Sequence, residues 1–293
     1  MILSYLPVHF YISFDSPTNA DTSPLFVLRS VLGKELRSMS CVSHQIKCAD
    51  CMYKSTCVYA FLFETILQSE NDVLPGRDRA SHPFAFTQAG KAGKIIKDYD
   101  FTISLFGKAI DYLPYINEAF VRAGKNGLFK SRTSFSVTVD ENLVDKELQP
   151  YTVEVSNGEG VKKGEILLEL KSPLRFKTGG RYGTDFSAQD FMNCLFRRAS
   201  TLCKLYGSCE EDFRYVPNEN ISIAERNLHW VESTHYSARQ KNKMELGGVI
   251  GTLKLKGTFL QKDIELLEFA HIANAGKNTN FGLGQMDFLV KWE

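Results

Sequence analysis

The order of apolar patterns along this chain occurs twice, and that repetition limits the folds it can adopt. In the first half, Val8 to Phe14 alternates apolar with polar residues, which predicts a half-buried strand. Ser23 and Pro24 then supply an N-cap and a first-turn proline for an amphipathic helix over 24–39. The half continues with predicted strands near 84, at 101–105 and at 135–139, and with a helix over 108–123 that ends at Gly124.

The second half repeats this order of elements. A strand is predicted at 166–170 and a helix from Ser187 to Gly207. The chain then passes through a hairpin-like region to a strand at 249–255, a helix near 262–272 and a strand at 286–290. Because strand–helix–strand–strand–helix–strand is the ferredoxin-like order, we predict an α+β protein of two tandem ferredoxin-like domains, residues 1–155 and 156–293.

Composition excludes several other classes of protein. Of the 293 residues, 43% are hydrophobic and 24% are charged, which is typical of a soluble globular chain and argues against intrinsic disorder. Val58–Phe63 is about the longest apolar stretch, far short of the roughly 18 residues that a membrane span needs. The N-terminal sequence lacks the basic residues and cleavage site of a signal peptide. We therefore expect a cytoplasmic protein with no membrane partner.

Four of the seven cysteines lie in the segment 41–57, which interrupts the first half as a Cys-rich insertion. Four thiolates could complete a tetrahedral zinc site, and thiolates also hold iron–sulfur clusters. Free thiols that pack in the interior are a third interpretation. We favour a structural metal, with zinc as the first choice. Its predicted ligands are Cys41, Cys48, Cys51 and Cys57.

The segment Gly276–Gln285 is rich in glycine and lies between the last predicted helix and the last strand. Its backbone N–H groups could hold a phosphate, with Lys277 adding positive charge, although a glycine-rich turn into an edge strand is the simpler interpretation. The net charge is only +1, yet basic residues cluster near 171–198 and 239–256. Such local excess favours a surface that follows a phosphate backbone.

Several motifs together suggest a family. Gly276–Gln285 resembles the C-terminal glycine-rich loop of the repeat-associated RNA-binding (RAMP) superfamily of CRISPR systems. The segments Ser172–Lys177, Arg197-Arg198 and Tyr236–Gln240 are similar to its branch of endoribonucleases that cleave precursor CRISPR RNA. This resemblance implies two RNA-recognition-type domains, CRISPR repeat RNA as the ligand, and other CRISPR effector subunits as further partners.

The resemblance also implies a metal-independent reaction that needs no cofactor. The ribose 2′-OH attacks the adjacent phosphate, leaving a 2′,3′-cyclic phosphate, and the reaction needs a base, an acid and positive charge near the phosphate. Members often place a catalytic histidine just after the first helix, and His44 is the histidine at that position. Lys47 would neutralise charge and Tyr53 is a weaker candidate. His82 and His235 are the next choices for the histidine.

The predicted RNA contacts belong to the basic segments and to the glycine-rich segment. An alternative function is a non-catalytic RNA-binding subunit of a CRISPR effector complex. A zinc-dependent nuclease is disfavoured, because four cysteine ligands would leave no open position for water. The predicted RNA-binding residues are Arg175, Lys177, Arg197, Arg198, His235, Arg239, Gly276, Lys277, Gly282 and Gly284.

Overall fold

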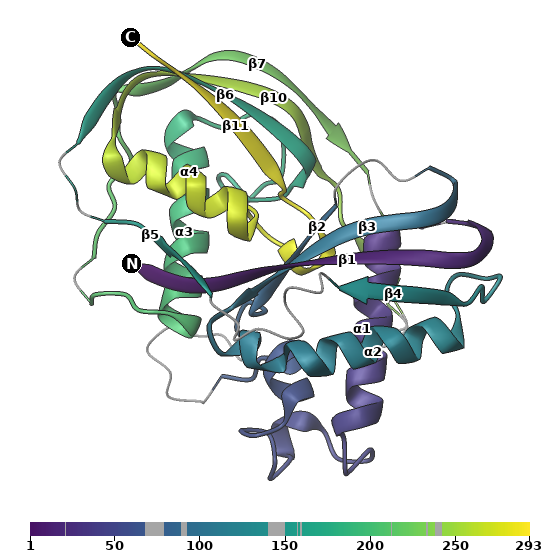
Figure 1. The fold of residues 1–293 in the computed structure, drawn as a ribbon. Helices are drawn as coiled ribbons and strands as arrows, with labels where there is room; N and C mark the ends of the chain where they lie inside the picture. The colour runs from purple at the N-terminus through teal and green to yellow at the C-terminus, as the bar shows by residue number, and fades with distance from the viewer. Residues whose placement is uncertain are drawn as a thin grey trace. The chain divides into compact units, whose positions relative to one another are not determined.

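The computed structural model divides into two compact units, which Figure 1 shows as a ribbon. The N-terminal unit is Ser4–Tyr151, and the C-terminal unit combines Met1–Leu3 with Thr152–Glu293. The sequence-based boundary was between residues 155 and 156. The structure describes residues 1–20, 22–67, 79–88, 93–139, 150–156, 158, 160–211, 213–232, 234–237 and 242–293.

The N-terminal unit is built on an antiparallel sheet of strand order β2-β3-β1-β4. The short strand β5 pairs with β1 and, after its first residue, belongs to the C-terminal unit. Two helices pack against each other on the N-terminal unit (Figure 1). The bounds are β1 Ile2–Asn19, α1 Pro24–Ser40, β2 Phe84–Gln88, β3 Ile95–Phe106, α2 Leu113–Asn126, β4 Phe135–Val139 and β5 Tyr151–Glu154.

Alternation in the sequence explains which face of the sheet is buried. Val8, Phe10 and Ile12 of β1 are fully buried, whereas His9 and Tyr11 between them are exposed. This is the period-2 pattern of a strand with one face in the core. The predicted first strand and first helix are therefore confirmed, although the strand is longer than its apolar pattern.

The helix predicted over 108–123 differs from the observed element. Residues Gly107–Tyr112 form a 3₁₀ turn, and α2 continues beyond the predicted end to Asn126. Gly127, with a φ of 73°, caps the helix in place of Gly124. Gly124 lies inside the helix, where a Cβ atom would come within 2.2 Å of the Phe135 carbonyl oxygen. Position 124 thus requires glycine because α2 packs closely on β4, and not because the helix ends there.

The Cys-rich segment lies between α1 and β2. It contains the 3₁₀ helix η1, Cys48–Asp50, and is followed by the π-helix η2, Ala60–Glu64. Single-turn π-helices are rare and often accompany functional sites. Thr65 ends this one in a left-handed conformation with a φ of 45°. The buried Glu64 carboxylate accepts from Arg79 at 2.6 Å and from the Tyr59 hydroxyl at 3.1 Å.

The C-terminal unit has a four-stranded antiparallel sheet of order β11-β6-β10-β7, and β8 and β9 form a separate pair. The helices α3 and α4 pack against each other beneath the curved sheet (Figure 1). The bounds are β6 Val161–Leu174, α3 Ala188–Tyr206, β7 Ile221–Val231, β8 Thr234–Ser237, β9 Asn242–Glu245, β10 Gly248–Leu260, α4 Gln261–Ala273, η5 Thr279–Phe281 and β11 Met286–Trp292.

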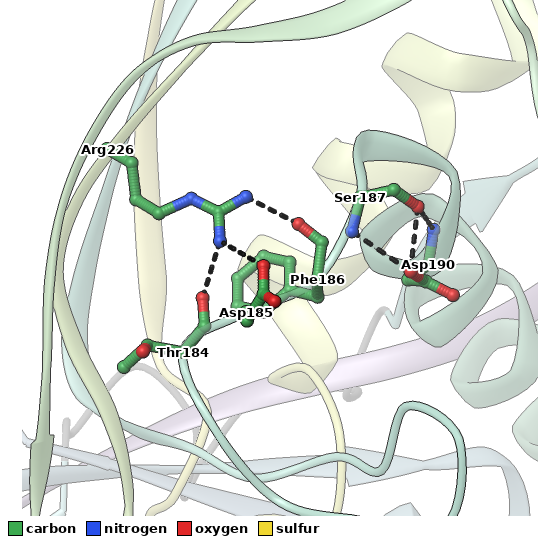
Figure 2. Close-up of polar contacts among 6 residues, drawn as sticks. All are labelled: Thr184, Asp185, Phe186, Ser187, Asp190 and Arg226. Carbon is green, nitrogen blue, oxygen red and sulfur yellow. Dashed lines mark hydrogen bonds and ion pairs between the residues drawn. The ribbon is translucent and has the colours of Figure 1, made fainter.

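Polar side chains set where the helices of this unit begin. Ser187 and Asp190 form the capping box of α3, since the Ser187 hydroxyl accepts from the Asp190 N–H while the Asp190 carboxylate accepts from the Ser187 N–H (Figure 2). The fully buried Asp263 carboxylate accepts from the Leu260 N–H at 2.8 Å at the start of α4. The predicted start of α3 near Ser187 and its end at Gly207 are confirmed.

The first residues of the chain belong to the C-terminal unit. The Met1 ammonium group donates to the Val155 carbonyl at 2.8 Å, and Ile2 forms a two-way backbone pair with Ser208. Leu3 is fully buried. Residues from both ends of the sequence thus contribute to one unit. Among the helices that the structure describes, none is long and apolar enough to cross a membrane.

Candidate nucleic-acid interface

The segment 274–285 after α4, here called the glycine-rich loop, is closed by its own backbone. Ala275 donates its N–H to the Gly284 carbonyl at 2.8 Å, and Gly284 donates to the Pro173 carbonyl at 3.1 Å. Lys277 donates to the Arg175 carbonyl at 2.8 Å. Backbone hydrogen bonds within the loop and to the end of β6 therefore hold the loop in place. Its tight turns use positive φ at Asn274, Gly276, Asn278, Gly282 and Gly284.

The glycines of this loop are required by the protein's own backbone. A Cβ atom at Gly284 would lie 1.8 Å from the Ala275 carbonyl oxygen, and one at Gly276 would lie 2.5 Å from the Arg175 carbonyl oxygen. Gly282 is buried. The close approach at Gly276 and Gly284 is internal, which accounts for glycine at these two positions. RNA contact with Gly276, Gly282 and Gly284 stays a prediction.

Two side chains of helix α3 contact the end of α4 and the start of the glycine-rich loop. The guanidinium of Arg198 donates to the Ala273 carbonyl from Nε at 3.3 Å and from Nη2 at 3.1 Å. The Gly276 N–H donates to the sulfur of Cys194, and burial raises the pKa of that thiol to about 12. Two side chains one helical turn apart therefore hold the end of α4 and the loop's first glycine.

Arg198 is consequently not an RNA contact, and that prediction is wrong. Its side chain is buried, and burial lowers the pKa of its guanidinium to about 10. The group stays charged at neutral pH and satisfies a helix-end carbonyl that would otherwise be unpaired in the interior. Cys194 and Cys203 of the same helix are buried as well.

Four of the predicted cations remain available around the loop. Lys177, Arg197 and Lys277 are exposed, and Arg175 is partly buried. Arg197 lies on α3 next to Arg198, which holds the end of α4, and Lys277 lies in the loop itself. Arg175 reaches the loop through its carbonyl. The structure thus brings together Arg175, Lys177, Arg197 and Lys277 on one unit.

Two further predicted contacts are described incompletely. The backbone of His235 lies in β8 opposite Met244, and its side chain lies outside what the structure describes. Arg239 lies outside the described residues. Both predictions therefore stay predictions.

The predicted catalytic residues lie in the exposed segment after α1. His44, Lys47 and Tyr53 are all exposed, and the His44 carbonyl accepts a long hydrogen bond of 3.5 Å from Arg37 Nη2. Within the described part of the chain, no hydrogen bond or ion pair joins the side chains of His44, Lys47 and Tyr53 to one another. A substrate can reach them, but this structure shows no assembled proton-transfer group.

The other histidines have varied surroundings. His82 Nε2 lies 3.4 Å from Arg29 Nη2, and its ring packs edge-on against Phe63 and Phe84. His229 is exposed on β7. The Nδ1 atom of His271 lies 3.1 Å from the Asp287 carboxylate and 3.1 Å from the Met286 carbonyl.

The cysteines of the 41–57 segment approach one another without forming a recognisable metal centre. Burial is the main cause that raises the pKa of Cys48, and the nearby Glu64, Cys41 and Cys57 raise it further. Thiols that are close in space suit a metal in their chemistry. Across the residues that the structure describes, however, no three His, Cys, Asp or Glu side chains converge as ligands. The structural zinc therefore stays a prediction.

Sequence reasoning missed two aromatic residues beside Arg175. The Arg175 guanidinium lies 4.1 Å from the centre of the Tyr182 ring, and the Trp230 ring centre is 6.4 Å from that of Tyr182. Tyr182 follows the Gly179-Gly180 pair, which is a hairpin-turn signal. That signal could have indicated a projecting hairpin but not its contact with β7.

These observations define an α+β protein of two antiparallel sheets with a cation-flanked glycine-rich loop. A family model for the CRISPR-associated endoribonuclease Cas6 matches residues 168–286, and a model described as an N-terminal domain matches residues 3–162. Residues 168–286 of the chain thus match the family of CRISPR-associated endoribonucleases Cas6.

Solved structures and a curated relative are similar to this chain over most of its length. A Cas6 product complex has a TM-score of 0.54 at 14% identity and covers 97% of this chain and 99% of its own. A Thermus thermophilus Cas6 has a TM-score of 0.53 at 14% identity, covering 98% and 99%. A partial Cas6-RT-Cas1–Cas2 complex reaches 0.55 at 12% identity, covering 99% of this chain and 46% of that one. These likenesses show the fold.

The curated relative is an uncharacterized protein of Archaeoglobus fulgidus. The two sequences are 22% identical over an alignment of 264 residues, which covers 87% of this chain and 88% of that protein. The similarity thus extends over both units rather than over one motif.

Proposed function

We propose that this protein cleaves CRISPR repeat RNA within its precursor by a metal-independent transesterification. The observation that carries the proposal is the group of cations around the glycine-rich loop, within the segment that matches the Cas6 family model. Lys277 lies in the loop and Arg197 on α3; both are exposed, and their charge suits a phosphate backbone. The two sheets, of order β2-β3-β1-β4 and β11-β6-β10-β7, support an assignment to two ferredoxin-like domains.

The proposed reaction needs no co-reactant. A base takes the proton from the 2′-OH, the 2′-oxygen forms a bond to the adjacent phosphorus, and the bond from phosphorus to the 5′-oxygen breaks. An acid returns a proton to that 5′-oxygen, so the products are a 2′,3′-cyclic phosphate and a free 5′-OH. His44 would transfer protons, Lys47 would stabilise charge on the phosphate, and Tyr53 would assist. Their exposure supports access to RNA.

A second function has one specific observation in its favour. Because His44, Lys47 and Tyr53 form no mutual polar contacts in the described part of the chain, the protein could bind CRISPR RNA without cleaving it. A structure similar to this chain forms part of a Cas6-RT-Cas1–Cas2 complex, which supports CRISPR proteins as partners in either case.

The test is incubation of the purified protein with repeat RNA in EDTA. We expect cleavage, and a 3′-end that resists polyadenylation until the cyclic phosphate is removed. RNA with a single 2′-deoxy substitution at the cleaved position is the matched control, since it should bind with equal affinity and stay intact. Binding without cleavage would establish the second function instead. Cleavage of the 2′-deoxy RNA would exclude attack by the 2′-OH.

A further inference from the structure

The hairpin that follows β6 carries the aromatic side chain of Tyr182. Its tip is a tight turn in which Thr178 and Arg181 exchange two backbone hydrogen bonds of 2.9 and 3.0 Å. Gly179 and Gly180 have φ values of 56° and 81°, as a two-residue hairpin turn requires. A Cβ at either glycine would meet nothing within 4 Å, so the tip projects freely. Residues 175–187 are here called the arm.

The far end of the arm is fastened to β7. Arg226 donates to the Thr184 carbonyl at 2.7 Å and to the Phe186 carbonyl at 2.5 Å, and it lies 3.5 Å from the Asp185 carboxylate (Figure 2). Ser187 then starts α3 through its capping box (Figure 2). An arm held at both ends keeps its side chains in place before any ligand arrives, which lowers the entropy cost of binding.

Tyr182 on this arm lies among cations. The Arg175 guanidinium is 4.1 Å and the Lys177 ammonium 5.2 Å from the centre of its ring. Arg175 is itself fixed, because its Nη1 donates to the Gly247 carbonyl at 2.7 Å. The Arg175 carbonyl accepts from Lys277, so the arm is continuous with the glycine-rich loop.

Trp230 completes an aromatic pair with Tyr182. The two ring centres are 6.4 Å apart with the planes tilted by 44°. The indole N–H donates to the Glu232 carboxylate at 2.6 Å, and a Cβ at Gly247 would lie 2.9 Å from the indole. Because Gly247 has no side chain, the indole of Trp230 can occupy this space. Tyr182 and Trp230 are both partly exposed.

We propose that Tyr182 and Trp230 form a stacking site for an unpaired nucleobase of RNA, with Lys177 contacting the adjacent phosphate. The inference rests on the proposed function and adds a contact to a base where the loop offers contacts to phosphate. Aromatic rings next to cations are the usual means of holding single-stranded RNA, because every base has a π-face. A base-paired helix cannot use the site, since its bases are already stacked.

The first experiment uses the wild-type protein and a single-stranded uridine oligonucleotide that contains one 2-aminopurine. Stacking quenches the fluorescence of this base, so we expect quenching with the single strand and none when the same base is paired in a hairpin stem. Tyr182→Ala should abolish the quenching and weaken binding of the single strand roughly 5- to 100-fold. Tyr182→Phe, which keeps the ring, should retain both.

Matched controls separate stacking from charge and from folding. Tyr115→Ala removes a half-exposed tyrosine of α2, 48% exposed, and should leave the affinity unchanged. Lys177→Ala should reduce the slope of affinity against salt by about one, whereas Tyr182→Ala should leave that slope as it is. Because the quenching is measured on wild type, the test does not depend on whether a variant folds.

Failure of this site and failure of the proposed function are distinguishable. If wild type binds the single strand without quenching, and Tyr182→Ala binds as wild type does, the stacking site is refuted while RNA binding stands. Such a result would leave the aromatic pair available to a protein partner. If wild type binds neither repeat RNA nor the uridine strand, the proposed function is wrong and this site falls with it.

Discussion

The buried guanidinium of Arg198 donates two hydrogen bonds to the carbonyl of Ala273, so that α3 holds the C-terminal end of α4. Its neighbour Arg197 points to solvent. Two adjacent arginines of one helix therefore have separate tasks, one in the interior and one on the surface beside the glycine-rich loop.

Arg198→Met should destabilise the protein while Arg197→Met should not. Removal of the Arg198 guanidinium leaves the Ala273 carbonyl without its donors, at a cost of about 1–3 kcal/mol in unfolding free energy. Arg197→Met should instead weaken RNA binding and reduce its dependence on salt, because one phosphate contact is lost. Urea unfolding and filter binding on both variants measure the two effects. An Arg198→Met protein with wild-type stability would contradict the anchoring role.

Gly284→Ala should unfold the protein more easily than Gly180→Ala. Both glycines have a positive φ, 75° and 81°, so both variants carry the strain of a left-handed alanine, about 1 kcal/mol. Only at Gly284 would the new Cβ also collide with backbone, 1.8 Å from the Ala275 carbonyl oxygen. The difference between their urea midpoints isolates that collision. Equal midpoints would show that the loop relaxes at no cost.

His44→Ala should slow cleavage of repeat RNA by about 10²–10⁴-fold and leave RNA affinity nearly intact. The physical reason is that a proton-transfer group acts on the barrier, whereas affinity comes from many phosphate contacts. Single-turnover kinetics measure the cleavage step directly. His82→Ala is the matched variant, because its ring packs against Phe63 and Phe84 and should affect stability first.

The control for that prediction is the metal content of the His44 variant. If it loses metal and activity together, His44 is a ligand of the Cys-rich segment rather than a base. Wild-type cleavage by His44→Ala would refute the catalytic assignment.

Cys48→Ser should lower both zinc content and melting temperature if the Cys-rich segment binds metal. The free energy of binding a structural metal is coupled to folding, so loss of one thiolate affects both. Cys209→Ser, at a partly exposed cysteine of the C-terminal unit, is the matched control. Elemental analysis of freshly purified wild type decides the matter first, because absence of zinc and iron would remove the prediction.

Local patterns allowed most elements to be predicted from the sequence. The capping box at Ser187 and the alternation at Val8–Phe14 each involve only a few neighbouring residues. Such short patterns are enough to predict where α3 begins and which face of β1 is buried. Arg198 was wrongly predicted to contact RNA, although its spacing from the apolar residues of the helix indicates burial. It lies three residues after Leu195 and four before Leu202, on the apolar face of α3, and that position favoured burial over an RNA contact.

Other features depend on contacts between distant segments. His271 and Asp287 meet because α4 packs beside β11, and Tyr182 meets Trp230 because the arm folds back on β7. No spacing rule joins such pairs. The role of Gly284 was missed for the same reason, since the atom that excludes a side chain belongs to Ala275, nine residues earlier in the chain and across the loop.

The attachment of Met1–Leu3 to the C-terminal unit affects the order of folding. Met1 and Val155 are 154 residues apart in sequence, and ribosomes make the first of them long before the second. The C-terminal unit therefore cannot finish folding from its own continuous segment, and the whole N-terminal unit lies within the loop that this contact closes. A fragment that starts at Thr152 would leave Ser208 without the backbone partner that Ile2 supplies, so the two units cannot be separated by cutting the chain once.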